Sequence, residues 1–223
     1  MNLEPLLKEA WTLIKRNYTI TLPTIFSIFV VSFLALGIIG SPEDASGIAL
    51  VSFLSGVISL YAHGVTLVMA DEALVSGSTS LRTAGRAAGR FFLPFALASV
   101  IISVVVGLGL ALFLVPGLIA AYFLMFAMTA VAVDGAGALT ALSRSYRVVR
   151  GSAREAFVLF VFLFVAALAF GLLNLVLSVI PVVGQLAGVI LSGIFGGGAA
   201  VLLVRTYRDL TAAARHPSSQ MSL

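Results

Sequence analysis

Asp71 and Glu72 are the residues of this sequence whose chemistry stands out first, because two adjacent carboxylates follow a long apolar stretch. Such a pair could serve acid–base chemistry or bind a cation. Neighbouring residues on a helix point about 100° apart, however, so the two groups would not face each other as a catalytic pair does. The interpretation we favour is that they bond to nearby arginines and cap or orient the segment that follows.

His63 precedes Asp71 by two helical turns, on nearly the same face and about 12 Å away along the axis. An ionisable side chain inside an apolar stretch is a functional candidate. A proton relay from His63 to Asp71 would need waters or other groups between them, so we favour a histidine bonded to a serine or a carbonyl. Asn174 is a further polar side chain deep in an apolar stretch, and interhelical hydrogen bonding accounts for it.

Several kinds of chemistry are excluded by what the sequence lacks. It contains no cysteine, which rules out disulfides, thiolate metal sites and cysteine nucleophiles. It contains no HExxH motif for a metalloprotease and no GxSxG motif with a usable histidine. We therefore expect a protein that is not an enzyme and that has no catalytic residues, no cofactor and no metal.

The elements that must position these side chains are membrane-spanning helices. The hydrophobic fraction is 61% and the charged fraction 10%, whereas soluble domains have about 45–50% and about 25%. Six apolar stretches approach the roughly 20 residues that a helix needs to cross a bilayer. They cover residues 20–40, 48–70, 91–114, 117–133, 156–180 and 182–204. The sequence thus predicts an all-α, polytopic membrane protein with a single membrane domain over 1–210.

The 13 basic residues all fall on one side of these six spans. They lie before the first span, between the second and third, between the fourth and fifth, and after the sixth. Because cytoplasmic loops carry the excess of Lys and Arg, this predicts both termini in the cytoplasm and three helical hairpins in the cell membrane. We expect 211–223 to form a flexible cytoplasmic tail. Topology also explains the basic pI, so we expect no nucleic-acid partner.

Helical periodicity is found in the basic segment before the first span and in the basic segments that follow the second and fourth spans. It predicts amphipathic helices lying at the membrane interface. Their arginines could bind the headgroups of anionic lipids, or could serve only to set topology during insertion. The candidates for headgroup binding are Arg82, Arg86, Arg144, Arg147 and Arg150. We favour an interaction or lipid-organising module, with membrane lipids, a second copy or another membrane protein as partners. The alternative is a small transporter or channel whose polar path includes His63, Asp71 and Asn174.

Small residues recur every four positions along two of the spans, which is typical of helices whose backbones approach closely. In the third span the central member is Gly107. In the sixth span the series contains Gly184, Gly188, Ser192 and Gly196. We interpret both series as helix-packing faces. The three hairpins also share a pattern of basic segment, span, tight turn and span, which suggests an internal repeat.

A family resemblance rests on a few of these segments together. They are MADEAL (69–74), GSTSL (77–81), LVPG (114–117), VD (133–134) and ALSRSYRVVRG (141–151). The sequence resembles a set of uncharacterised prokaryotic six-helix membrane proteins, well represented in halophilic archaea. It is similar to the membrane domain attached to some glycerophosphodiester phosphodiesterases. The resemblance implies the six-helix arrangement and no catalytic residues, because the phosphodiesterase chemistry belongs to a separate soluble domain.

Overall fold

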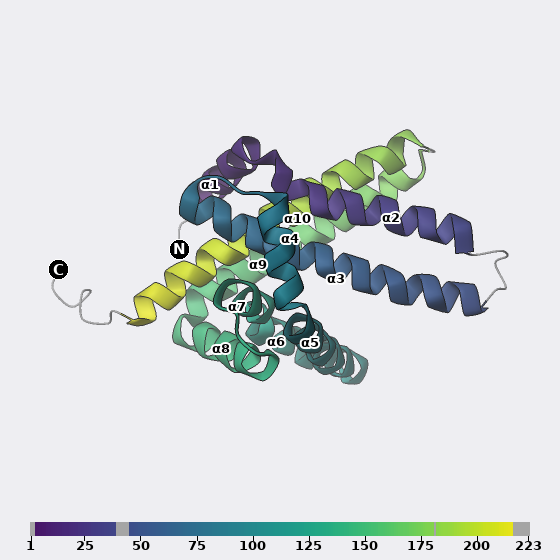
Figure 1. Cartoon of the computed structure of the whole chain (residues 1–223). Helices are drawn as coiled ribbons and strands as arrows, with labels where there is room; N and C mark the ends of the chain where they lie inside the picture. The colour runs from purple at the N-terminus through teal and green to yellow at the C-terminus, as the bar shows by residue number, and fades with distance from the viewer. Residues whose placement is uncertain (1–2, 39–44, 181, 216–223) are drawn as a thin grey trace.

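The computed structural model describes residues 3–38, 45–180 and 182–215, and every regular element in these ranges is a helix (Figure 1). The elements are, in chain order, α1 (Leu3–Arg16), the short 3-10 helix η1 (Tyr18–Thr21), α2 (Leu22–Ile38), α3 (Ala45–Ser76), α4 (Leu81–Arg90), α5 (Phe92–Leu112), α6 (Leu114–Leu124), α7 (Ala127–Asp134), α8 (Ala138–Gly151), α9 (Ala153–Ser178) and α10 (Val183–Arg215).

Within the described part of the chain, six helical segments are long and apolar enough to cross a membrane, which confirms the predicted number. They are Tyr18–Ala35, Ala45–Ser76, Phe92–Leu112, Leu114–Asp134, Ala153–Ser178 and Val183–Ala214. The helices α3 and α10 continue well beyond the predicted span ends at residues 70 and 204. As a result, 211–215, assigned to the tail from the sequence, belong to α10, whereas 39–40 of the first predicted span and 216–223 of the tail lie outside the described residues.

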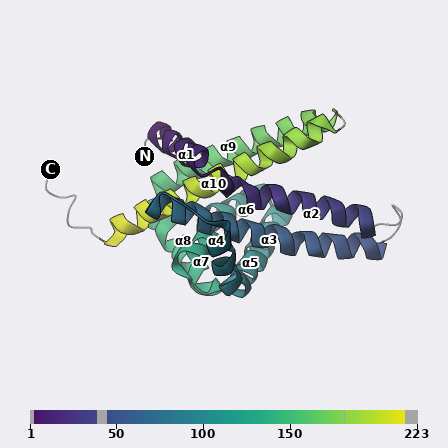
Figure 2. The same cartoon turned by 45° about the horizontal axis from the view of Figure 1, so that its top comes forward.

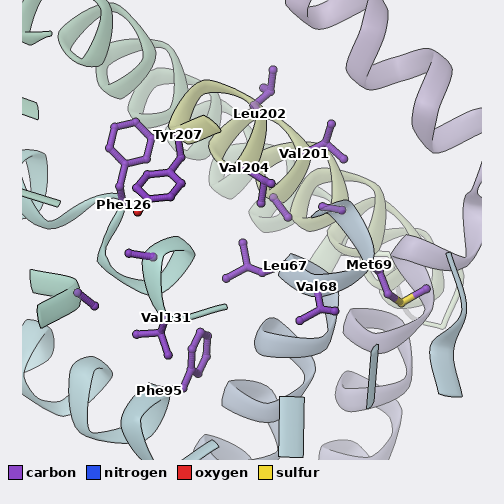
Figure 3. Packing of buried hydrophobic residues seen from close by; sticks show 14 of the residues in the cluster. Leu67, Val68, Met69, Phe95, Phe126, Val131, Val201, Leu202, Val204 and Tyr207 are labelled. Carbon is purple, nitrogen blue, oxygen red and sulfur yellow. The ribbon is translucent and has the colours of Figure 1, made fainter. Parts of the chain in front are cut away.

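Long helices that follow each other in the chain pack side by side, namely α2 with α3, α5 with α6, and α9 with α10. Figures 1 and 2 show these pairs spreading apart from a shared end of the molecule, near which α1, α4 and α8 lie. The buried core is at that shared end, where residues such as Leu67, Val131 and Val204 meet from α3, α7 and α10 (Figure 3). Most residues of each spanning segment are therefore not buried within the chain.

The helices α1, α4 and α8 occupy the positions where amphipathic segments were predicted. Each turns small or apolar residues toward the core one or two helical turns apart, as Ala84 and Ala88 do in α4 and Ala141 and Val149 do in α8. In α1, Ala10 and Ile14 are buried while Trp11 is half exposed. A helix with one buried face and one charged face suits a membrane surface, and the interfacial placement stays a prediction.

The fourth span is interrupted between α6 and α7, although its sequence predicts one continuous helix. Ser145 of α8 is fully buried at this break. Its hydroxyl donates to the carbonyl of Phe123 at 2.8 Å and accepts from the backbone N–H of Phe126 at 3.1 Å. The serine thus supplies hydrogen bonds that an unbroken helix would have made internally, which satisfies buried backbone groups.

The glycines of α10 face two different neighbours. A Cβ added at Gly193 would lie 2.5 Å from Ile25 Cγ1, and one at Gly197 3.4 Å from Ile20 Cγ2. Because these two residues have no side chain, the first span can pack closely against α10. Gly184 instead lies against the backbone of Leu177 at the end of α9.

The other small residues predicted to pack are placed as follows. A Cβ at Gly188 would meet the side chain of Asn174 at 2.8 Å, and one at Gly196 would lie 3.4 Å from Thr24. Ser192 bonds to the carbonyl of Gly188. Gly107 is exposed and has nothing within 4 Å of its Cβ position, so its predicted packing has no partner helix within the described chain.

Candidate functional site

Asp71 forms a two-bonded ion pair with Arg208, which joins α3 to α10. The Nε and Nη2 groups of Arg208 donate to the two carboxylate oxygens at 2.5 and 2.8 Å. The side chain of Asp71 is 20% exposed and that of Arg208 41%. A planar guanidinium matches a carboxylate in this two-bonded geometry, which fixes orientation as well as proximity. Asp71 therefore bonds to an arginine, but this arginine is 137 residues away in the chain and does not lie on the segment that follows Asp71.

Glu72 accepts hydrogen bonds at the start of α4. Its carboxylate receives Thr79 Oγ1 at 2.9 Å, the backbone N–H of Ser80 at 3.3 Å and Thr83 Oγ1 at 3.1 Å. A negative group at this end of a helix is favourable, since the N-terminus carries a partial positive charge and unpaired N–H groups. Glu72 thus caps α4 and fixes its position relative to α3.

Replacing Glu72 with alanine is expected to loosen α4 without unfolding the bundle. The loss of a helix cap costs about 0.5–2 kcal/mol. Hydrogen exchange of the α4 amides should rise in Glu72→Ala, whereas the α8 amides should keep their protection. Glu72→Gln, which retains an acceptor oxygen, is the matched control and should lie between parent and alanine. Equal α4 protection in all three proteins would show that Glu72 does not hold this helix.

A second polar cluster joins α7, α8 and α10. Asp134 accepts from Arg144 Nη1 at 2.5 Å, and the same carboxylate oxygen accepts from the hydroxyl of Tyr207. The Tyr207 ring is buried and lies 5.9 Å from the ring of Phe126, centre to centre (Figure 3). Hydrogen bonding to Asp134 raises the pKa of Arg144 above its ordinary value. Arg144 therefore stays charged and is engaged within the protein.

The polar residues of the alternative transport path are not brought together. His63 is exposed on α3, and its ring lies 6.0 Å from that of Phe95 on α5. Asn174 lies on α9, where its amide donates to the carbonyl of Phe170 one turn earlier at 3.1 Å. The chain has a groove between α2, α3 and α4, lined by residues such as Phe26, Ile58 and Gly85, and a crevice between α1, α9 and α10, lined by residues such as Trp11, Phe162 and Phe195. His63, Asp71 and Asn174 line neither of them.

The arginines predicted to bind headgroups divide into two groups. Arg144 is paired with Asp134. Arg82 and Arg86 of α4 and Arg147 and Arg150 of α8 are exposed, and none of them forms an ion pair within 3–38, 45–180 and 182–215. No carboxylate among the described residues therefore neutralises these four charges.

Sequence reasoning missed Ser145 and Tyr207, which hold α8 and α10 against the interrupted fourth span. A signal existed for Ser145, because it shares the four-residue spacing of the buried Ala141 and Val149. Tyr207 lies beyond the predicted end of the sixth span, in a stretch with Arg205 and Arg208, and its spacing gives no comparable signal.

Together, the six apolar helical segments and the charged clusters at their shared end define an all-helical, multi-pass membrane protein. Residues 95–210, more than half of the chain, match the family described as a domain of unknown function, DUF7847, and the chain belongs to this family. The matched segment begins within α5 and includes Asp134, Ser145 and Tyr207, but neither Asp71 nor Glu72. No curated protein and no solved structure matches the chain.

Proposed function

We propose that this protein binds anionic lipid headgroups at one membrane surface and thereby organises lipid around itself. The observation that carries the proposal is the set of exposed arginines on α4 and α8, which form no ion pair with any described residue. Each basic group close to an anionic membrane surface contributes about 1 kcal/mol, which decays within a Debye length of about 8 Å at physiological salt. Five such groups on two short helices, Arg82, Arg86, Arg90, Arg147 and Arg150, would enrich anionic lipid substantially.

The orientation and location of the protein are part of the proposal. We place α1, α4 and α8 and both chain ends at the cytoplasmic surface of the cell membrane, because the basic residues gather on these elements and cytoplasmic loops carry the positive excess. The similarity to the membrane domain of glycerophosphodiester phosphodiesterases stays a prediction. It suggests a role in which the helices serve as a membrane module.

We also propose that the protein has no enzymatic role. Asp71 and Glu72, whose chemistry first suggested one, are engaged in structural contacts with Arg208 and with the start of α4. The dispersal of His63, Asp71 and Asn174 likewise favours a binding module over a transporter. Ion-coupled flux through vesicles containing the protein, abolished in His63→Ala, would support the transporter instead.

Substituting Arg147 and Arg150 with glutamine is expected to reduce the anionic lipid that stays bound. Two charges at about 1 kcal/mol each correspond to at least a tenfold loss of affinity. The protein is reconstituted in equal parts of phosphatidylglycerol and phosphatidylcholine, extracted in mild detergent, and its retained lipid is measured by native mass spectrometry at low and high salt. The control is Lys8→Gln, since Lys8 is already paired with Glu4 at 2.7 Å. A double variant that inserts correctly and retains the parent's phosphatidylglycerol would mean that these charges serve insertion alone.

A further inference from the structure

A groove of about 950 Å³ runs between α2, α3 and α4. Apolar side chains make up its walls, among them Phe26 and Val30 of α2 and Ile58 and Val65 of α3. Phe26 is 69% exposed on the surface of a spanning segment, so the groove opens toward the apolar part of the membrane. Its size falls within the range of about 300–1,000 Å³ that is usual for small-molecule sites.

Helix α4 closes one end of this groove and is fixed there from two directions. Figure 1 shows α4 running across the directions of α2 and α3. The hydroxyl of Tyr61 on α3 donates to the carbonyl of Gly85 at 2.8 Å, and Glu72 caps the start of the helix. These bonds hold α4 against α3 at the groove.

The face of α4 that lines the groove borders directly on its cationic face. The lining residues recur every four positions, at Leu81, Gly85 and Gly89. An arginine follows each of them, about 100° further round the helix. These arginines are Arg82, Arg86 and Arg90, all of them exposed. A molecule lying in the groove would therefore end beside three positive charges that pair with no carboxylate in the described part of the chain.

We propose that this groove holds an acyl chain of an anionic glycerolipid whose phosphate is bound by Arg82 and Arg86. The inference rests on the proposed function and gives it a defined site. An apolar groove that borders on an unpaired cationic helix face matches one molecule that carries both an apolar chain and a negative headgroup. The groove walls alone could not select this lipid, because an acyl chain leaving the bilayer exchanges one apolar environment for another. The arginines therefore supply the selectivity, and the groove fixes where the bound lipid lies.

Gly89 gives direct access to the bound chain. Nothing lies within 4 Å of its Cβ position, so the groove is open there and a side chain can be added without a clash. Gly107 on α5 is equally exposed and equally free of neighbours, but it does not line the groove, which makes it a matched control. Since the protein has no cysteine, single cysteines at these positions can each carry one photoreactive benzophenone.

The experiment cross-links Gly89→Cys and Gly107→Cys in vesicles of equal parts phosphatidylglycerol and phosphatidylcholine. At Gly89 we expect lipid adducts enriched in phosphatidylglycerol at least about fivefold over those at Gly107, the effect of one basic group near an anionic lipid. Adding Arg82→Gln and Arg86→Gln should remove the enrichment. A cross-linked dimer from Gly89, or equal adducts with both lipids, would overturn the proposal.

A second variant separates failure of the groove from failure of headgroup binding in general. Gly89→Leu should narrow the groove beside the arginines of α4 and lower the retained phosphatidylglycerol, while Gly107→Leu should not. If Gly89→Leu retains the parent's lipid and Arg82→Gln with Arg86→Gln loses it, headgroup binding stands and the groove is not its site. If neither the α4 nor the α8 arginine variants lose lipid, the proposed function fails together with the groove.

Discussion

Gly193→Leu is expected to destabilise the protein more than Gly188→Leu or Gly107→Leu. A Cβ at Gly193 would lie 2.5 Å from Ile25 Cγ1 and 3.0 Å from the backbone oxygen of Thr21, and the remaining leucine atoms need more room still. The backbone oxygen cannot rotate away, so the start of α2 must move off α10. Overpacking of this kind costs about 1–3 kcal/mol and sometimes more. The melting temperature in detergent should fall clearly.

A graded series of glycines supplies the controls for this prediction. At Gly188 the first contact is the amide oxygen of Asn174, the end of a side chain that can move, so Gly188→Leu should destabilise less. Nothing lies within 4 Å of the Cβ position of Gly107, so Gly107→Leu should change the melting temperature little. Val189→Leu, next to Gly188, should also be mild. Equal melting of Gly193→Leu and Gly107→Leu would show that α2 and α10 do not approach as closely as in this structure.

The close approach at Gly193 also shows a limit of predicting helix packing from the periodicity of small residues. A four-residue series through Gly184, Gly188 and Gly196 predicts a single packing face on the sixth span. In the structure α10 packs against α3, α2 and α9, and it presents different glycines to α9 and to the start of the first span. A helix with several neighbours needs more than one packing face, and a single periodic series does not mark them all.

Hydropathy and charge predicted the elements themselves well. The spans can be predicted because a helix that crosses a bilayer needs about 20 apolar residues in a row. The short helices can be predicted because one face of each is buried and the other is charged. The capping of α4 by Glu72 was also foreseeable, since its partners follow it within 11 residues. By contrast, the groove depends on three helices meeting, and none of its lining residues is unusual for a span.

Asp71→Ala is expected to weaken the junction between α3 and α10 because it leaves Arg208 without its carboxylate. This partner is 137 residues away in the chain, and no local pattern connects the two. A hydrogen bond to a charged group contributes about 1.5–3 kcal/mol. Because Arg208 is 41% exposed, water can solvate part of the released charge, and we expect a loss near the lower end of that range. Thermal or denaturant unfolding in detergent measures it.

A double-mutant cycle separates the ion pair from other effects of the substitutions. If the pair is what holds the helices, Asp71→Ala combined with Arg208→Ala should cost less than the sum of the two single changes, because the second change then removes a charge that is already unpaired. Asp71→Asn is the control for shape, since it keeps the side-chain size and one acceptor oxygen but removes the charge. Strictly additive costs would mean that Asp71 and Arg208 act independently, and that α10 is held to α3 by the apolar contacts around Leu67 and Val204 instead.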